Sequence, residues 1–212
     1  MGAAQWIARL ILLAILALCW YEWPPRSYWA MWLSAIGWIV FTVYWGIAAR
    51  SAGAAKSSES GRSRLIHVVL LNGGILMLFI SFPGLRQDFL PPIWGWGVLG
   101  LMIQFSFFRF GVWARTHLGV NWSARVEVKE NPELVRSGPY KKLRHPIYTA
   151  VLGMAIGTAI VSGKVHALVG VAMLIVAYFR KIRIVEATLR QTFGSQYDDY
   201  RRETWGMIPG LF

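Results

Sequence analysis

The chain has 212 residues, of which 56% are hydrophobic and only 15% charged. This balance excludes an ordinary soluble domain, in which about a quarter of the residues are charged. The formal net charge of +12 could indicate nucleic-acid binding, but basic residues in so hydrophobic a chain more often flank membrane spans. We expect an all-α integral membrane bundle without a nucleic-acid partner. A single cysteine, Cys19, excludes an intrachain disulfide and a cysteine metal cluster.

Six apolar runs are long enough, or nearly so, to cross a bilayer. They are Trp6–Tyr21, Tyr28–Ala49, Leu65–Phe82, Ile93–Phe108, Pro146–Ser162 and Val165–Phe179. We read the first as a retained span rather than a signal peptide. Residues 1–113 would then hold four spans, and residues 114–212 a second region with a connecting segment, the last two runs and a polar C-terminal part. Five spans, with one run re-entrant or interfacial, is the alternative.

The last two runs read as a tight helical hairpin, because only Gly163 and Lys164 separate them. In the first of the two, Gly153 and Gly157 are four residues apart. They share one helical face, which permits close helix packing.

Charge is distributed unevenly between the two sides of this predicted bundle. Six spans place both termini, the loop Arg50–Arg64 and the segment Ala114–His145 on one side, and these parts are basic. The connectors on the other side are nearly balanced in charge. The positive-inside rule therefore predicts that both termini are cytoplasmic.

The stretch Gly138–Tyr148 begins the late hairpin. Gly-Pro is a turn signal, and Pro146 suits the first turn of a helix. Unpaired backbone N–H groups in that turn, together with Arg144, His145 and Tyr148, would favour a carboxylate or a phosphate. The alternative is a turn with basic residues at a membrane surface.

A second polar element follows the hairpin directly, at Arg180–Gly194. Its helical pattern gives an apolar stripe and, beside it, a charged ladder of Arg183, Glu186 and Arg190. The alternative is an amphipathic helix on lipid headgroups with a self-paired ladder. Because this helix leaves the hairpin that Pro146 starts, the two parts can close over one cytoplasmic pocket. The stripe consists of Ile182, Val185, Leu189 and Phe193.

Together these motifs resemble the isoprenylcysteine carboxyl methyltransferase family, with phospholipid N-methyltransferases as broader relatives. The resemblance covers roughly Gly119–Pro209. It rests on Leu134-Val135-x-x-Gly138-Pro139-Tyr140-x-x-x-Arg144-His145-Pro146-x-Tyr148 and on Glu186-x-x-Leu189-x-x-x-Phe193-Gly194-x-x-Tyr197-x-x-Tyr200.

The resemblance implies an integral-membrane enzyme that uses S-adenosylmethionine, held without a Rossmann glycine fingerprint. Tyr140 and Tyr148 can offer π faces to adenine or to the sulfonium, His145 can hold the methionine carboxylate, and Glu186 the ammonium. The expected cofactor-binding residues are Leu134, Val135, Gly138, Tyr140, Arg144, His145, Pro146, Ile147, Tyr148 and Glu186. The acceptor would be lipophilic, prenylated or lipid-like, and would enter from the bilayer. A carboxylate acceptor is favoured and a lipid amine is possible.

The chain departs from the family pattern at two positions. Family members typically carry two adjacent acids shortly before the position of Leu189, and an arginine four residues before the first of these acids. This chain has Val185 and Lys181 at those positions, and only the second acid, Glu186, is present. Arg183, one turn before Glu186, could take over the anion contact, whereas lysine is no equivalent of a bidentate arginine. The catalytic candidates are therefore Glu186, Arg183 and Lys181.

Two other functions share parts of this pattern. NADPH-dependent sterol reductases have a similar Arg-His-Pro-x-Tyr turn, and the same basic pocket could hold a dinucleotide phosphate. A non-catalytic membrane scaffold is the third reading. The short Ala114–His145 segment and the Phe193-Gly194 ending favour the methyltransferase.

Overall fold

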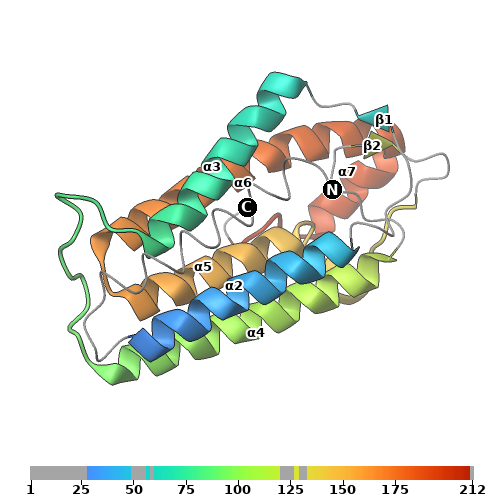
Figure 1. Cartoon of the computed structure of the whole chain (residues 1–212). Helices are drawn as coiled ribbons and strands as arrows, with labels where there is room; N and C mark the ends of the chain where they lie inside the picture. The colour runs from blue at the N-terminus through green and yellow to red at the C-terminus, as the bar shows by residue number, and fades with distance from the viewer. Residues whose placement is uncertain (1–27, 49–55, 58–59, 120–126, 129–132, 211–212) are drawn as a thin grey trace.

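The computed structural model describes residues 28–48, 56–57, 60–119, 127–128 and 133–210. They form a helical bundle with a short helix and a two-stranded sheet at one end (Figure 1). The elements are α2 (Tyr28–Ala48), β1 (Lys56–Ser57), α3 (Gly61–Phe79), α4 (Trp94–Leu118), β2 (Glu127–Val128), the 3-10 helix η3 (Gly138–Lys141), α5 (Pro146–Ser162), α6 (Val165–Phe193) and α7 (Ser195–Glu203). The predicted helical bundle is confirmed, and the first predicted run, Trp6–Tyr21, lies outside the described residues.

Several helices of the bundle have the length and composition of membrane spans. Among the described residues, three are long and apolar enough to cross a membrane, at Trp29–Ala48, Gly61–Phe79 and Trp94–Leu118. Helix α5 is apolar but shorter. It has the predicted bounds, and Gly163 follows it with a φ of 65°. This left-handed conformation suits glycine and permits the tight turn into α6.

Two helices extend beyond the apolar runs that the sequence shows, because a charged residue ends an apolar run without ending a helix. Helix α4 continues past Phe108 to Leu118, and α6 continues past Phe179 to Phe193. The predicted final helix is thus the second half of one 29-residue helix. Both α4 and α6 end at glycines with positive φ, 54° at Gly119 and 53° at Gly194, where other residues would be strained.

The closest packing in the bundle is between α4 and α5, and it depends on glycine. A Cβ at Gly157 would lie 2.6 Å from the backbone N of Gln104 and from the carbonyl oxygen of Gly100. A Cβ at Gly153 would lie 2.1 Å from the ring of Phe107. The close packing predicted for Gly153 and Gly157 is therefore confirmed.

Polar side chains inside the bundle join α2 to α4 and α5. Nε1 of Trp38 donates to Oγ1 of Thr158 (2.9 Å), and Ser34 Oγ lies 3.0 Å from the same oxygen. Nε2 of Gln104 donates to the carbonyl of Ser34 (2.9 Å). Such contacts satisfy polar groups where no water is available.

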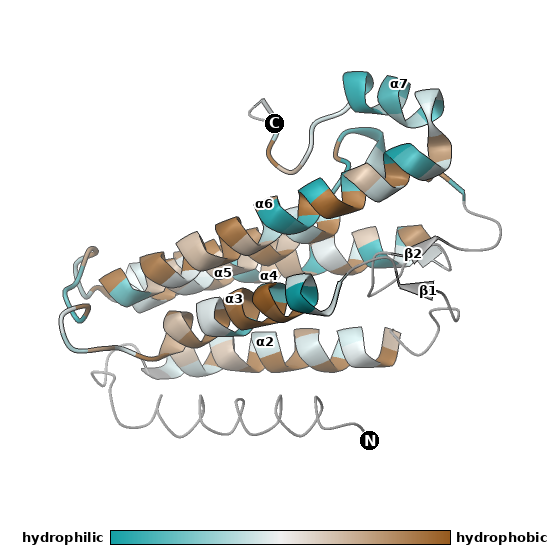
Figure 2. Ribbon diagram, turned by 90° about the horizontal axis from the view of Figure 1, so that it is seen from above, coloured by the Kyte–Doolittle hydropathy of each residue, from teal (hydrophilic) through white to brown (hydrophobic). Residues whose placement is uncertain are grey.

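Hydrophilic residues collect at one end of the molecule. Figure 2 shows them in α7 and in the second half of α6, while the bundle is more apolar. Strand β1, which follows α2, pairs antiparallel with β2, which follows α4. The two basic loops predicted to share one side of the membrane therefore meet.

The glycine contact gives a first prediction. Gly157→Ala should lower the free energy of unfolding by about 1–3 kcal/mol, because the new methyl group meets backbone atoms that cannot turn aside. Thermal unfolding of the detergent-purified protein measures the effect. Gly95→Ala in α4 is the matched control, since no atom lies within 4 Å of its Cβ position, and it should be neutral or slightly stabilising. Equal stability of the two variants would contradict the proposed packing.

Candidate functional site

The candidate site lies where the start of α5, the charged half of α6 and the segment after α7 meet. Backbone hydrogen bonds fix the turn before α5 to that segment. The N–H of Arg144 donates to Trp205 (2.8 Å), the N–H of His145 to Gly206 (3.0 Å), and the N–H of Trp205 to Lys142 (3.0 Å). Because this seam is made by the main chain, it positions the side chains of residues 144 and 145 firmly.

Glu186 is the acid at the centre of the site. Its Oε1 accepts from Nε of Arg144 (2.9 Å) and from Nε2 of His145 (3.1 Å), and its Oε2 lies 3.5 Å from Nε of Arg201. Burial alone would raise the pKa of Glu186, but the hydrogen bonds from His145 and Arg144 outweigh it and lower the pKa to about 2. Glu186 is therefore ionised at neutral pH.

His145 faces Glu186 as a neutral donor. Burial lowers its pKa, and the opposing effect of Glu186 does not cancel this. Because an ionised carboxylate only accepts hydrogen bonds, Nε2 must carry the proton. The imidazole ring stacks on Tyr148, with 5.4 Å between ring centroids and 3° between planes. Tyr148 in turn stacks on Tyr178 of α6 at 4.8 Å. His145 therefore contacts both Tyr148 of the first motif and Glu186 of the second.

Arg144 is buried, and its guanidinium contacts Glu186, the end of α7 and the segment after α7. Its Nη1 donates to the carbonyls of Arg201 (3.1 Å) and Thr204. The predicted set of unpaired donors in that turn was also partly wrong, since the N–H of Tyr148 donates to the carbonyl of His145 (3.0 Å). A tight turn at the helix start satisfies this donor internally.

The earlier part of the motif lies against α4 and α7. Tyr140 is buried, with its hydroxyl 3.4 Å from the carbonyl of Ala114, and its own carbonyl accepts from the hydroxyl of Tyr200 (2.7 Å). Gly138 has a φ of 57°, and a Cβ there would lie 2.6 Å from the ring of His117, so glycine is required. The remaining predicted residues are Leu134, Val135, Pro146 and Ile147, before and at the start of α5. Of these, Leu134, Val135 and Ile147 are half-buried and Pro146 is buried.

The other two catalytic candidates lie on different faces of α6. Lys181 is buried, whereas Arg183 is exposed one turn before Glu186. The ion pairs seen for Glu186 reach other segments of the chain rather than neighbours on α6. Arg190 similarly pairs with Asp198 of α7 (2.8 Å). These ion pairs join α6 to α7 and to the turn before α5. They replace the predicted ladder within α6.

Sequence reasoning missed Arg201 and Thr204. Both act through the segment that follows Tyr197 and Tyr200, whose side chains are buried. The signal was present, because Tyr197-x-x-Tyr200 is part of the motif and Arg201 comes directly after it. No pattern in the sequence alone connected Arg201 to Glu186.

Comparison with known proteins agrees with this architecture. The fold is that of a helical membrane protein, similar to a solved structure described as the eukaryotic intramembrane Ras methyltransferase, isoprenylcysteine carboxyl methyltransferase. The TM-score is 0.65 at 23% identity, over 95% of this chain and 73% of that chain. Residues 98–191 match the isoprenylcysteine carboxyl methyltransferase family. The resemblance predicted from the motifs is thereby confirmed over this segment.

Several curated proteins are similar in sequence. The protein-S-isoprenylcysteine O-methyltransferase of Schizosaccharomyces pombe is 27% identical over 61% of this chain and 56% of its own length. The enzyme of the same name from Dictyostelium discoideum is 28% identical over 72% of this chain and 66% of its own length. The Bacillus subtilis protein YpbQ is 28% identical over 44% of this chain and 54% of its own length. The chain thus spans only about half to two thirds of these relatives.

The low pKa of Glu186 predicts how stability depends on pH. Because the folded-state pKa lies near 2 and the ordinary value is 4.5, the carboxylate contributes its full stability above about pH 5. That contribution is lost as the pH falls toward 2. Glu186→Gln should therefore lower the free energy of unfolding by about 2–4 kcal/mol at pH 7 and lose this part of the acid dependence.

Thermal unfolding between pH 2 and 7 measures both effects. Glu203→Gln is the control, because Glu203 is exposed at the end of α7 and its replacement should leave the profile unchanged. Identical profiles for wild type and Glu186→Gln would show that the ion pairs do not stabilise the fold.

Proposed function

We propose that the chain is an integral-membrane methyltransferase that uses S-adenosylmethionine and methylates a lipophilic acceptor. One observation carries the proposal. Glu186 is held by Arg144 and His145, so the two motifs of the resemblance meet inside the segment 98–191 that matches the family. The same cluster also stabilises the fold, and its place inside the segment that matches the family favours a role in catalysis as well.

The residues present suit the amino-acid end of that cofactor. The ionised carboxylate of Glu186 is the complement that the ammonium group of this zwitterion needs. The stacked rings of His145 and Tyr148 add a flat polarisable surface for a cation or a heterocycle. When bound, S-adenosylmethionine supplies an electrophilic methyl group. The chain's own groups would hold the cofactor, align the acceptor and exclude water.

The acceptor that this site favours is a carboxylate rather than an amine. An ammonium acceptor must lose a proton before it can attack, and a general base works best with a pKa near the working pH. Glu186, with a pKa near 2, is too weak a base for that step. A carboxylate needs no base, and its charge is neutralised as it attacks a sulfonium methyl, so a dry site helps it. The exposed Arg183 and the half-exposed Arg201, with Lys181 nearby on α6, are the candidates for holding its charge.

We further propose that this site faces the cytoplasm and that the acceptor enters laterally from the bilayer. Strands β1 and β2, which belong to the two basic loops, lie at the same end of the bundle as α7 (Figure 1), and the positive-inside rule favours a cytoplasmic position for such a basic end. Residues 1–113 would supply four spans, and residues 114–212 the catalytic region with its cofactor pocket. The preferred acceptor is a prenylated cysteine carboxylate or a similar lipid-like acid.

Cofactor binding is the direct test. S-adenosylhomocysteine at 100 times its dissociation constant should stabilise the detergent-purified protein by about 2.7 kcal/mol, seen as a higher melting temperature. NADPH should give no shift. Stabilisation by NADPH alone would favour a reductase. No response to either compound would contradict both enzyme assignments and favour a non-catalytic membrane scaffold.

The acceptor class has its own test. Transfer of labelled methyl groups to a farnesylated cysteine with a free carboxylate should exceed transfer to a farnesylated amine by at least about tenfold, since the amine lacks a base. Arg201→Gln should raise the KM for the acid with little change in cofactor affinity. Arg202→Gln is the matched control, because Arg202 is exposed and pairs with Asp199. A preference for the amine would contradict a carboxylate acceptor while leaving methyl transfer intact.

A further inference from the structure

The outer face of α4 carries an arginine within a candidate membrane span. Arg109 is exposed and lies about two and a half helical turns after Gly100, which packs against α5. Arg109 is therefore on the side of α4 that faces away from α5. Its guanidinium makes no hydrogen bond or ion pair with any described residue. Because an ionisable group in a span normally faces the bundle interior and has a partner there, Arg109 indicates a function outside the bundle.

The other arginine of α4 has a structural role that Arg109 lacks. Arg115 is 4% exposed, and its Nη1 and Nη2 donate to the carbonyls of Gly119 (3.0 Å) and Ala48 (2.7 Å). It thereby joins the ends of α2 and α4. Arg109 makes no contact of this kind, so helix packing does not account for its presence in the span.

An open hollow of about 370 Å³ lies beside Arg109. Its described lining comes from one face of α4, with Ser106, Arg109, Phe110 and Trp113. Trp113 is 50% exposed. The hydroxyl of Ser106 already donates to the carbonyl of Met102 (2.7 Å), so Arg109 is the one charged group among these lining residues. A molecule that enters the hollow therefore meets an accessible cation beside aromatic side chains.

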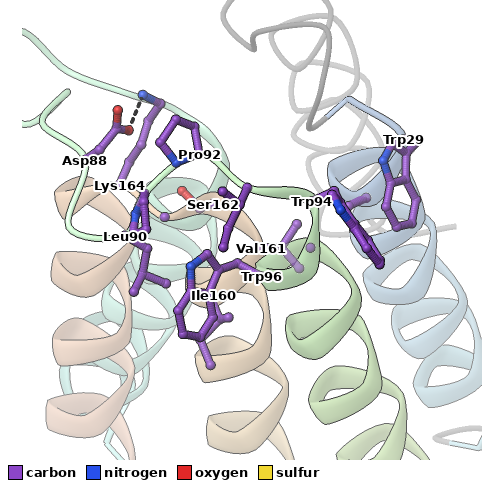
Figure 3. A pocket seen from close by; sticks show the side chains of 15 residues that line it. Trp29, Asp88, Leu90, Pro92, Trp94, Trp96, Ile160, Val161, Ser162 and Lys164 are labelled. Carbon is purple, nitrogen blue, oxygen red and sulfur yellow. Dashed lines mark hydrogen bonds and ion pairs between the residues drawn. The ribbon is translucent and has the colours of Figure 1, made fainter.

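The position of Arg109 along α4 puts it within reach of lipid headgroups. At its other end α4 begins at Trp94, which is 73% exposed (Figure 3), and tryptophans gather at the headgroup level. A hydrocarbon core of about 30 Å takes about 20 helical residues, so its second boundary falls near Trp113. Arg109 lies one turn inside this boundary, from where an arginine side chain reaches the interface. This is the leaflet of the candidate site, because the carbonyl of Ala114 contacts the hydroxyl of Tyr140.

The chain offers Arg109 no acid at this level among the described residues. Helices α2, α3, α4 and α5 contain no Asp or Glu, and Glu186 of α6 belongs to the candidate site. At the far end of the bundle, by contrast, Asp88 neutralises Lys164 at 2.9 Å (Figure 3). A second copy packed through these helices would bring no acid either. The remaining source of an anion at this depth is the lipid itself.

We propose that the hollow on α4 binds the phosphate of an anionic phospholipid, in the leaflet of the candidate site. Arg109 donates to the phosphate oxygens as a planar fork, and the glycerol end of the acyl chains lies against Trp113. A zwitterionic lipid binds less well, because its own cation stands next to the phosphate. The proposal does not depend on methyl transfer, since Arg109 faces away from α5.

Binding can be tested on the full chain in an uncharged detergent, by native mass spectrometry that resolves the first lipid bound. Dioctanoyl phosphatidylglycerol should bind more tightly than dioctanoyl phosphatidylcholine. Dioctanoylglycerol, which lacks the phosphate, and inorganic phosphate, which lacks the chains, should bind at least about tenfold more weakly. Arg109→Gln should weaken the affinity for phosphatidylglycerol about 5-fold, which corresponds to about 1 kcal/mol for one basic residue at an anionic surface. Arg109→Lys, which keeps the charge but not the fork, should fall between.

Arg202→Gln is the matched control, because it removes one exposed charge from α7 and leaves α4 unchanged. It should bind phosphatidylglycerol as the wild type does. The melting temperature of Arg109→Gln without lipid should equal that of the wild type, since no described residue bonds to the guanidinium. Equal weakening in Arg109→Gln and the control would reveal a response to net charge alone and would overturn the proposal. So would unchanged affinity of Arg109→Gln, equal affinity for phosphatidylcholine or dioctanoylglycerol, or no binding by the wild type.

Discussion

One buried carboxylate holds the polar end of this molecule together. Glu186 on α6 accepts from Arg144 and His145 before α5, and Arg201 on α7 approaches its second oxygen. An ion in this position is stable only when its partners are in place, because removing one leaves an uncompensated charge. The acid therefore ties three segments that are distant in sequence to a single geometry. Any ligand that binds here meets a preformed arrangement of charges.

The bundle below supplies a rigid base for this arrangement through a different interaction. Helices α4 and α5 approach so closely that their glycines are in contact through the backbone. Membrane helices often pack through small residues in this way, because the hydrophobic effect does not drive apolar helices together in lipid. Helix α5 begins at Pro146, directly after His145. The glycine contact thus holds α5 in place, and α5 in turn positions His145 directly before its first residue. Packing inside the membrane and charge at its surface act on the same element.

The sequence was informative where the pattern was local and less so where it depended on the fold. Pro146 and Gly163 mark the ends of α5 by their backbone chemistry alone, and both bounds were predicted. The apolar runs end before α4 and α6 do, because hydropathy reports the membrane and not the hydrogen bonding of a helix. The resemblance assigned Glu186 and His145 to one pocket, and in the structure their side chains lie within hydrogen-bond distance. Arg201 could not be assigned to it, because only the folded seam between residues 142–145 and 204–206 brings it to the acid.

The three contacts to Glu186 differ in a way that bears on how the site would work. Arg144 and His145 are buried and lie within hydrogen-bond distance, whereas Arg201 is 47% exposed and 3.5 Å away. Arg144 also donates to the carbonyls of residues 201 and 204. Its side chain therefore cannot move away from Glu186 without breaking these hydrogen bonds. Arg201 has no such commitment among the described contacts and is weakly held by solvent-screened charge. A ligand ammonium can therefore take the place of Arg201 on Oε2 while the buried contacts to Oε1 stay intact. The guanidinium that is released lies at the rim of the site, where an acceptor carboxylate would need a cation.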